Sequence, residues 1–340
     1  MTARYDVVVV GSGPVGAAFA LAIKAHGATV LLLESREHGG APPGVRPIAL
    51  SYGSRLIFER LGVWTQLKPA TPIARIHVSQ RGHFGRAELT AREAGFPELG
   101  YVVDYASLVS ILDAAVSTCG LEVLRGATVS TVAHGPTSAR VEFISASGVG
   151  ECMSSLVVIA DGSAVAADID VTTRDYGQTA VTARIDADRP HRQTAYERFT
   201  PHGPIALLPL EGSYGLVWTM RTLEAEDLLR ASPAAFLDHL QKMFGERAGR
   251  FTGASARSAQ RLSLRVAQRT TWGRSVVIGN AAQSLHPVAG QGFNLGLRDA
   301  WELATEIHAH GVDDGNVVNA YGARRFLDRA GGIAFTDGLV

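Results

Sequence analysis

Three glycines near the N-terminus have the spacing of a loop that binds a dinucleotide. Gly11, Gly13 and Gly16 follow four consecutive valines and precede a run of apolar residues with helical spacing. In such a unit the first glycine permits a tight turn, the second lets a pyrophosphate approach the backbone, and the third lets the helix lie against the strand. The N-terminus of this helix, around Pro14, presents amide donors to the phosphates. The segment therefore predicts a dinucleotide site that includes Gly11, Gly13, Pro14 and Gly16.

An acidic residue completes this unit. Glu34 ends the second strand, eighteen residues after Gly16, where a carboxylate can accept hydrogen bonds from the hydroxyls of an adenosine ribose. A 2'-phosphate would be repelled at this position, which excludes NADP from this site. NAD and FAD both stay open from these residues, and a solvated charge at the strand end is the ordinary alternative for Glu34.

A second loop, residues 279–300, combines a Gly-Asn step, a His-Pro turn and two close glycines before an apolar helix. Gly290 and Gly292 let the backbone approach a planar group, and the helix directs its positive end there. Reduced flavin carries negative charge at its N1/C2=O edge, whereas NAD has no equivalent charge, so the loop favours FAD. Asn280 can bind a ribitol or pyrophosphate oxygen, or it caps a helix.

Four further residues are candidates with ordinary alternatives. Arg46 follows a Gly/Pro-rich loop and points at a ligand or lies on the surface. Asp161 ends the strand of residues 154–163, where ligand loops gather, or forms a simple Asp-Gly turn. His286 and His202 are weak candidates for acid/base roles, because a lone loop histidine is more often structural.

The elements that position these residues alternate between two patterns. Residues 5–34, 105–120, 154–163 and 274–307 read as the strands and helices of a parallel α/β unit. Residues 74–85 and four segments between 179 and 219 read as strands of an antiparallel sheet, with a hairpin across Glu211-Gly212. We expect two domains, with 1–72, 98–172 and 264–340 binding the dinucleotide, and 73–97 and 173–263 forming a sheet over it. The apolar strands 205–210 and 214–218 line a pocket for an apolar ring or form core.

Composition limits the class of protein. Of 340 residues, 46% are apolar and 19% are charged, which is typical of a globular protein with a large core. Lys+Arg and Asp+Glu both number 32 without a basic cluster, so a nucleic-acid partner is not expected. Cys119 and Cys152 fit neither a disulfide framework nor a metal pair, and no signal peptide or membrane span is evident. These features predict a cytoplasmic protein without a metal.

At these residues the chain resembles the FAD-dependent aromatic hydroxylases, in particular the ubiquinone-biosynthesis branch typified by 2-polyprenyl-6-methoxyphenol hydroxylase. The resemblance covers essentially the whole chain and is carried by "GSGPVG", "RPIALSYGS", "IHVSQRGH", "IADG", "ERFTPHGPIALLPL" and "GNAAQSLHPVAGQGFNLGLRD". It implies a Rossmann-like FAD-binding domain of the glutathione-reductase/p-hydroxybenzoate-hydroxylase type, with an inserted antiparallel-sheet substrate domain. The positions that match flavin-contacting residues of the family are Arg46, Asp161, Gly279, Asn280, Pro287, Gly290, Gln291, Gly292 and Asn294.

The chain departs from the family pattern at three places. Asn280 stands where the family usually has aspartate, and Val165 and Asp168 stand where it has a serine and an arginine associated with flavin and nicotinamide handling. Relatives also continue for several helical turns beyond the residues "GGIAFTDGLV". We therefore expect a C-terminal segment of the family to be absent from this sequence.

The resemblance implies the reaction cycle. NAD(P)H reduces tightly but non-covalently bound FAD, O2 forms a flavin C4a-hydroperoxide, and one oxygen atom is transferred to the aromatic ring of a polyprenylated phenol. It further implies a hydrophobic substrate, a ubiquinone-biosynthesis complex, and peripheral association with the surface of the inner membrane.

Two alternatives from other classes stay open. One is another flavin oxidoreductase on the same fold, although the chain has neither the W-x-W-x-I-P motif of a halogenase nor the C-x4-C of a disulfide reductase. The other is a non-catalytic subunit that binds flavin within a biosynthetic complex. Only the hydroxylase has to form the C4a-hydroperoxide, so stopped-flow spectroscopy separates the three.

Overall fold

The computed structural model of the protein describes residues 2–37, 44–68, 70–163 and 169–339. Its first unit is strand β1 (Ala3–Val10), helix α1 (Pro14–Lys24) and strand β2 (Val30–Glu34). Every residue of β2 is buried, as expected for a central parallel strand that is covered on both faces. Pro14 stands in the first turn of α1, where a missing N–H group removes no helical hydrogen bond.

In the described chain, eight strands form the first sheet. The main path is β18-β19-β11-β1-β2-β8, and the pairs β19–β11, β11–β1, β1–β2 and β2–β8 are parallel. Antiparallel strands β9 and β10 continue from β11. The bounds of the strands not yet given are β8 (Glu122–Arg125), β9 (Thr128–His134), β10 (Ala139–Ser145), β11 (Gly148–Ile159), β18 (Thr271–Trp272) and β19 (Ser275–Val277). Because parallel strands end at the same edge, the loops after β1, β11 and β19 lie together there.

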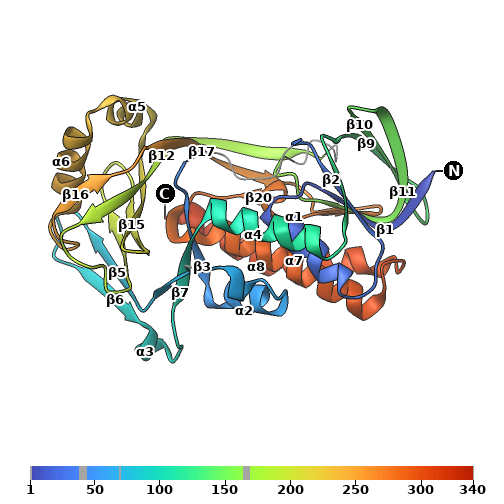
Figure 1. Ribbon diagram of the computed structural model, residues 1–340, viewed down its shortest axis with the longest axis horizontal. Helices are drawn as coiled ribbons and strands as arrows, with labels where there is room; N and C mark the ends of the chain where they lie inside the picture. The colour runs from blue at the N-terminus through green and yellow to red at the C-terminus, as the bar shows by residue number, and fades with distance from the viewer. Residues whose placement is uncertain (1, 38–43, 69, 164–168, 340) are drawn as a thin grey trace.

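Helices cover one face of this sheet, and the β9–β10 strands lie at its other side (Figure 1). The helical layer consists of α1, α4 (Tyr105–Thr118), α7 (Gln291–His310) and α8 (Asn316–Gly338), with α2 (Tyr52–Arg60) beside them. Their apolar side chains, including the buried Phe19, Phe58 and Leu297, share one core with Val7 and Val9 of β1. This core fixes α1 and α7 relative to the strand ends.

A second sheet is predominantly antiparallel and contains nine of the described strands. Its main path is β20-β17-β12-β15-β14-β13-β5-β6, with β16 paired to β12. The strand bounds are β5 (Arg75–Gln80), β6 (Arg86–Thr90), β12 (Val171–Ala187), β13 (Thr194–Phe199), β14 (Ile205–Leu210), β15 (Ser213–Arg221), β16 (Phe251–Ala254), β17 (Ser258–Ala267) and β20 (Gln283–Ser284). The hairpin across Glu211-Gly212 is confirmed, because Leu210 pairs with Ser213.

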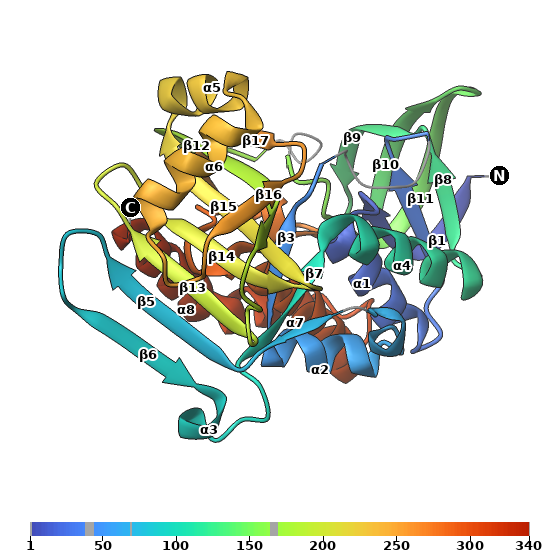
Figure 2. The same ribbon diagram turned by 60° about the vertical axis from the view of Figure 1, so that its left-hand side comes forward.

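The two faces of the nine-stranded sheet have different partners. Helices α5 (Thr222–Arg230) and α6 (Pro233–Phe244) cover the outer face, where Trp218 and Phe236 belong to one buried cluster. The opposite face, which we call the inner face, is covered in part by a three-stranded sheet of β3 (Pro47–Ser51), β7 (Gly100–Asp104) and β4 (Thr71–Ile73). Figure 2 shows the β5–β6 hairpin and the short helix α3 (Ala91–Ala94) at the margin of the nine-stranded sheet.

The observed sheets confirm the expected α/β class with an antiparallel insert. We propose the same two functional units as the sequence suggests, because residues 75–90 and 171–267 supply all strands of the nine-stranded sheet except β20. No helix in the described part of the chain is long and apolar enough to cross a membrane.

Candidate functional site

The three glycines of the first loop have different surroundings. Gly11 has φ +98°, and a Cβ there would lie 2.7 Å from the Cα of Asp161. A Cβ at Gly16 would lie 2.1 Å from the carbonyl oxygen of Gly11. Both glycines are therefore required by the packing of the protein itself. A Cβ at Gly13 would meet no atom of the described residues within 4 Å, so this glycine borders a space that those residues leave unfilled.

The N-terminus of α1 borders this space and is not capped by the protein. Gly13 is the N-cap, no side chain accepts a hydrogen bond from the first turn, and the turn contains no acidic residue. The first N–H groups of a helix have no partner within the helix and carry a partial positive charge. An anionic group such as a pyrophosphate fits these N–H groups and the open space beside Gly13.

Glu34 is buried and held in its ionised form. One carboxylate oxygen accepts hydrogen bonds from the N–H and hydroxyl of Ser12, both at 2.9 Å, and the other accepts from the N–H of Arg36 at 3.0 Å and from its Nε at 2.9 Å. Burial alone would raise the pKa of Glu34, but the hydrogen bonds from Arg36 and Ser12 outweigh it and lower the pKa to about 2. Sequence reasoning missed Ser12 and Arg36, although both lie within two residues of predicted site positions.

The loops after β11 and β19 meet the first loop at the strand ends. The carboxylate of Asp161 accepts a hydrogen bond from the N–H of Ser163 at 3.0 Å, and its Cα lies against Gly11. Gly279 begins the short 3-10 helix η3 (Gly279–Ala281), and a Cβ there would lie 3.0 Å from Val15 of α1. Asn280 is exposed beside it. The structure thus brings Asp161, Gly279 and Asn280 to the edge that holds the first loop.

A second uncapped helix N-terminus follows in the chain. The 3-10 helix η4 (Val288–Gly290) starts after Pro287, and Gly290 is the N-cap of α7 with φ +60°. No side chain caps α7, and its first turn, which contains Gln291 and Gly292, has no acidic residue. Among the described residues, a Cβ at Gly292 would meet only the Cβ of Leu285, at 3.9 Å, which is an ordinary contact. Protein packing therefore gives no reason for glycine at this position.

Asn294 has no free hydrogen-bonding capacity in its side chain. Its amide donates to the carbonyls of Ala49 at 2.8 Å and Gly290 at 2.7 Å, and its oxygen accepts from the N–H of Ser51 at 2.8 Å and the hydroxyl of Ser54 at 2.6 Å. An asparagine side chain can make about four such bonds. We therefore assign Asn294 a positioning role, because it ties β3 and α2 to the first turn of α7.

Arg46 lies just before β3. Its guanidinium stands over the ring of Tyr105, 4.8 Å from the ring centre, and its carbonyl accepts a hydrogen bond from the Tyr105 N–H at 2.9 Å. This stacking places the charge of Arg46 at the start of α4. Val165 and Asp168, by contrast, lie outside the described residues.

A buried ion pair holds the loop of Gly279, and sequence reasoning missed it. Asp299 of α7 accepts hydrogen bonds from the N–H of Gly279 at 3.1 Å, from Gln283 at 2.7 Å and from Nε of Arg325 at 2.9 Å. Only 1% of Asp299 and 4% of Arg325 is exposed. Burial raises the pKa of Asp299, while Arg325 and Gln283 act in the opposite direction. An acid within the apolar stripe of α7 was the only sequence signal for this pair.

His286 is a neutral, structural histidine in this arrangement. Its Nδ1 accepts a hydrogen bond from the N–H of Val288 at 3.1 Å, so its Nε2 carries the proton and donates to Oε1 of Gln178 at 3.1 Å. Burial lowers the pKa of His286 to about 4. His202 lies elsewhere, between β13 and β14, half-exposed with its Nδ1 3.1 Å from Glu224. The structure brings His286, but not His202, into the loop before α7.

We predict that protonation of His286 destabilises the fold in mild acid. Its pKa is lower in the folded state than the ordinary value of 6.5, so the folded state binds fewer protons and stability falls as the pH drops from about 6.5 towards 4. The loss between pH 7 and pH 5 should be about 2 kcal/mol, measured by urea unfolding. His286→Asn should show a smaller loss, whereas the exposed control His83→Asn should behave as the wild type. Equal losses in all three proteins would refute the prediction.

The two apolar strands that were expected either to line a pocket or to form core do form core on one face. Leu207, Leu216 and Trp218 point into the outer-face core beneath α5 and α6. The alternate residues Ala206 and Val217 lie on the inner face and are only partly buried. Strand alternation thus leaves a partly open apolar surface on the side where β3 lies.

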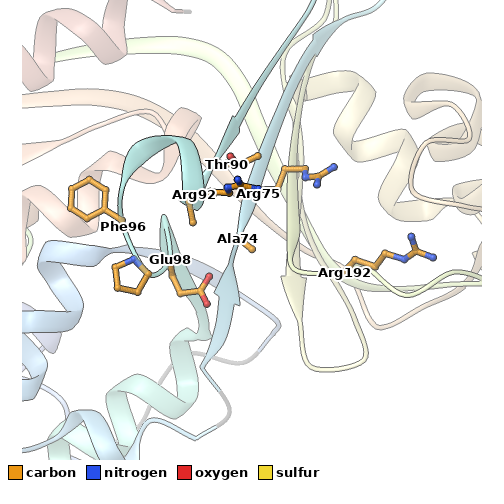
Figure 3. A pocket seen from close by; sticks show the side chains of 9 residues that line it. Ala74, Arg75, Thr90, Arg92, Phe96, Glu98 and Arg192 are labelled. Carbon is orange, nitrogen blue, oxygen red and sulfur yellow. The ribbon is translucent and has the colours of Figure 1, made fainter.

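A separate hollow of about 370 Å³ lies at the margin of the nine-stranded sheet. Figure 3 shows Arg75, Thr90, Arg92, Phe96, Glu98 and Arg192 around it. The lining residues come from β5, β6, α3 and their adjoining loops, except Arg192, which lies in the loop between β12 and β13. None of the predicted site residues lines this hollow. It is an open surface feature formed by other elements, and the candidate site is the one built on the two glycine loops.

Comparison with known proteins gives a class and then a family. Residues 4–327 match the model of the FAD binding domain. The solved structure of p-nitrophenol 4-monooxygenase PnpA from Pseudomonas putida DLL-E4 has a TM-score of 0.79 at 20% identity over 100% of this chain and 88% of its own. The flavin-dependent monooxygenase PieE, solved with FAD and substrate, has a TM-score of 0.76 at 20% identity over 96% of this chain and 63% of its own. The family match and the two uncapped helix N-termini beside the glycine loops identify the protein as an FAD-dependent monooxygenase.

Two curated relatives define its place in that class. Ubiquinone hydroxylase UbiL of Rhodospirillum rubrum is 33% identical over 361 aligned residues, which cover 98% of this chain and 81% of that protein. The 3-demethoxyubiquinol 3-hydroxylase of Escherichia coli is 29% identical over 86% of this chain and 77% of its own length. The chain belongs to the FAD-binding-domain family of monooxygenases, in the group of the ubiquinone hydroxylases.

Proposed function

We propose that the protein hydroxylates the aromatic ring of a polyprenylated phenol in ubiquinone biosynthesis, with NAD(P)H as reductant and O2 as oxygen source. The observation that carries this proposal is the pair of glycines, Gly13 and Gly292, that stand at uncapped helix N-termini without a packing reason. The free space beside Gly13 suits a pyrophosphate, and the free space beside Gly292 suits a planar ring. The names of the two curated relatives support the choice of a quinone precursor as substrate.

The residues proposed to hold FAD follow the two loops. The first-loop glycines and the α1 N-terminus would bind the pyrophosphate, and the loop of Gly279 and Asn280 would lie along the ribitol. Glu34 would accept from the adenosine ribose in place of the Ser12 hydroxyl, which rotates away. When bound, the flavin supplies the oxygen-transfer chemistry of the reaction. The α7 N-terminus would stabilise negative charge on the flavin ring, with the ring beside Gly290, Gln291 and Gly292. Arg46 and Asp161 complete the proposed set.

The substrate would lie between the α7 loop and the inner face of the nine-stranded sheet. The inner-face residues Ala206 and Val217 are apolar and only partly buried, as a surface for a phenol with an isoprenoid chain requires. An apolar substrate of this kind partitions into membranes, so we further propose that the protein works at a membrane surface and within a biosynthetic complex.

The substrate proposal is tested by comparing two phenols. Purified protein with FAD and NADH or NADPH should hydroxylate 2-prenylphenol with a kcat/KM at least about tenfold above that of phenol, because burial of the isoprenoid chain contributes about 0.8 kcal/mol per CH2 group. Mass spectrometry of the products gives both rates. Equal rates for the two phenols would contradict an isoprenoid-binding surface.

We predict that Gly292→Ala lowers the reduction potential of the bound flavin. The new methyl group fits the protein, since its nearest neighbour would be 3.9 Å away, but it separates the flavin ring from the positive end of α7. If the helix contributes about 1 to 2 kcal/mol, the two-electron potential should fall by roughly 20 to 45 mV. Spectroelectrochemistry measures the shift, with Gly331→Ala as a control, because Gly331 has similar free space in α8. An unchanged potential with FAD still bound would mean that the ring does not lie at this helix end.

A further inference from the structure

The direction of Glu197 on strand β13 follows from its neighbours. The ring of Tyr196 lies 5.7 Å from that of Phe244, and Nε of Arg198 donates to the carbonyl of Met243 at 3.2 Å, so both side chains point to α6 on the outer face. Ala195, in contrast, belongs to the cluster on the inner face. Because side chains alternate along a strand, Glu197 points to the inner face, on the same side as Ala195.

Glu197 ends a row of apolar side chains across the inner face. Strand pairing places Glu197 beside Ala206 of β14, Ala206 beside Val217 of β15, and Val217 beside Thr182 of β12. All four residues are partly buried. The carboxyl group therefore stands at one end of the surface that we propose for the substrate ring.

The loop before α7 approaches the sheet on one side of this row, and β3 approaches it on the other side. On one side, Gln178 of β12 is hydrogen-bonded to His286 before η4. On the other side, Ala49 of β3 packs against the cluster that contains Ala195, and a Cβ at Gly290 would lie 3.2 Å from Ala49. Glu197 is two residues from Ala195, which is roughly 7 Å along a strand. These contacts place Gly290 and the carboxyl of Glu197 on the same side of the sheet.

No neighbouring group in the described part of the chain stabilises a negative charge on the partly buried Glu197. No hydrogen bond or ion pair joins its carboxyl group to another residue in the described part of the chain. Burial raises the pKa of Glu197 to about 7, and burial is the sole cause of this shift. Its cross-strand neighbours on the inner face are Ala206 and Val78. A carboxyl group in this setting can change its protonation state near neutral pH.

We propose that Glu197 is the general base that accepts the proton of the substrate's ring hydroxyl, and this assignment rests on the proposed function. The O–H bond of the phenol breaks, a new O–H bond forms at a carboxylate oxygen of Glu197, and the electron pair stays on the ring oxygen. That pair increases electron density at the ring carbon that receives oxygen. The ring carbon that received oxygen then loses its hydrogen as a proton to water, and its electron pair restores the aromatic system and the negative charge on the ring oxygen. Glu197 returns its proton to that oxygen.

The assignment predicts the direction of a pH effect. Glu197 accepts a proton only when ionised, so the rate of hydroxylation should rise with pH through an apparent pKa near 7. The charged and titratable groups of the surrounding elements are Arg184 on the inner face of β12, the neutral His286 before η4, and Arg46 before β3. The pKa of His286 is lowered to about 4, so its titration lies well below this range.

The test uses Glu197→Gln and Glu197→Asp in the complete protein with bound FAD and 2-prenylphenol. Glu197→Gln should lower the rate of hydroxylation in a single turnover by about 100-fold and abolish the rise near pH 7, because general-base catalysis contributes on the order of 100-fold or more. Glu197→Asp should retain the pH dependence at a reduced rate. FAD affinity and flavin reduction by NAD(P)H should not change in either variant. Glu88→Gln is the matched control, since this exposed glutamate lies in the same sheet on β6, the strand beyond β5.

A more acidic phenol separates a base from a structural glutamate. A fluorinated 2-prenylphenol ionises at lower pH, so it should recover activity in Glu197→Gln by a larger factor than in the wild type. A wild-type pH profile and rate in Glu197→Gln would overturn the assignment while the proposed function stands. Failure of the wild type to hydroxylate either prenylated phenol would overturn the proposed function and the assignment together.

Discussion

Gly13→Val is expected to weaken FAD binding by about 1,000-fold, which corresponds to about 4 kcal/mol, while the protein still folds. A Cβ at this position meets no atom of the described residues within 4 Å, so we expect the substitution to leave the packing of the protein intact in the absence of the cofactor. It would occupy the space through which the pyrophosphate must approach the N–H groups of α1. Isothermal titration of protein freed of flavin measures the affinity, and thermal unfolding of the same sample measures the stability.

Two other glycine variants are controls for Gly13→Val, one for its position and one for loss of packing. Gly331→Val should bind FAD as the wild type does, because Gly331 also has free space but lies in α8, away from the loop. Gly11→Ala should lower stability as well as affinity, since its Cβ would collide with the backbone of Asp161. Full FAD affinity in Gly13→Val would show that the pyrophosphate lies elsewhere.

Asp299→Asn is expected to lower the free energy of unfolding by about 3 to 5 kcal/mol, because it leaves the buried guanidinium of Arg325 without its main counter-charge. The same change weakens the hydrogen bond that Asp299 accepts from the N–H of Gly279, so the loop beside the proposed ribitol site should loosen. Urea unfolding gives the stability, and FAD affinity should decrease in parallel.

Asp328→Asn is the matched control for this pair. Asp328 also bonds to Arg325 and Arg298, but 35% of its side chain is exposed to solvent, so the loss should stay within about 1 kcal/mol. Similar losses in the two variants would mean that burial of Asp299 adds nothing to the strength of its ion pair.

The sequence predicted those strands and turns whose pattern lies within a few adjacent residues. The strand of Thr194–Phe199 and the hairpin at Glu211-Gly212 were expected at the observed residues, because alternation and turn residues are properties of adjacent positions. The helical spacing of Leu56, Ile57, Leu61 and Trp64 predicts one helix that reaches Trp64, and that prediction is wrong. Helix α2 ends at Arg60, since Gly62 has φ +73° and turns the chain into a separate 3-10 helix, η1 (Trp64–Gln66).

Features that depend on distant partners were not visible in the sequence. Asp299 reads as a charge on an apolar helix until the fold places Arg325, 26 residues later, against it. The neutral state of His286 depends on Gln178, which is 108 residues away. Glu197 could not be singled out, because alternation assigns it to one face of β13 but does not say which face holds the site. Only the packing of β3 against the sheet decides that.

The central claim is that one atom of O2 is transferred to a phenol ring by this FAD-dependent protein, and labelled oxygen tests it most directly. Purified protein with bound FAD is supplied with NAD(P)H, 2-prenylphenol and O2 enriched in oxygen-18, and the product is analysed by mass spectrometry. The account predicts a hydroxylated product that carries one labelled oxygen atom, formed by the wild type and lost in Gly13→Val. Oxidation of NAD(P)H that yields only hydrogen peroxide, or a product whose new oxygen comes from water, would contradict it.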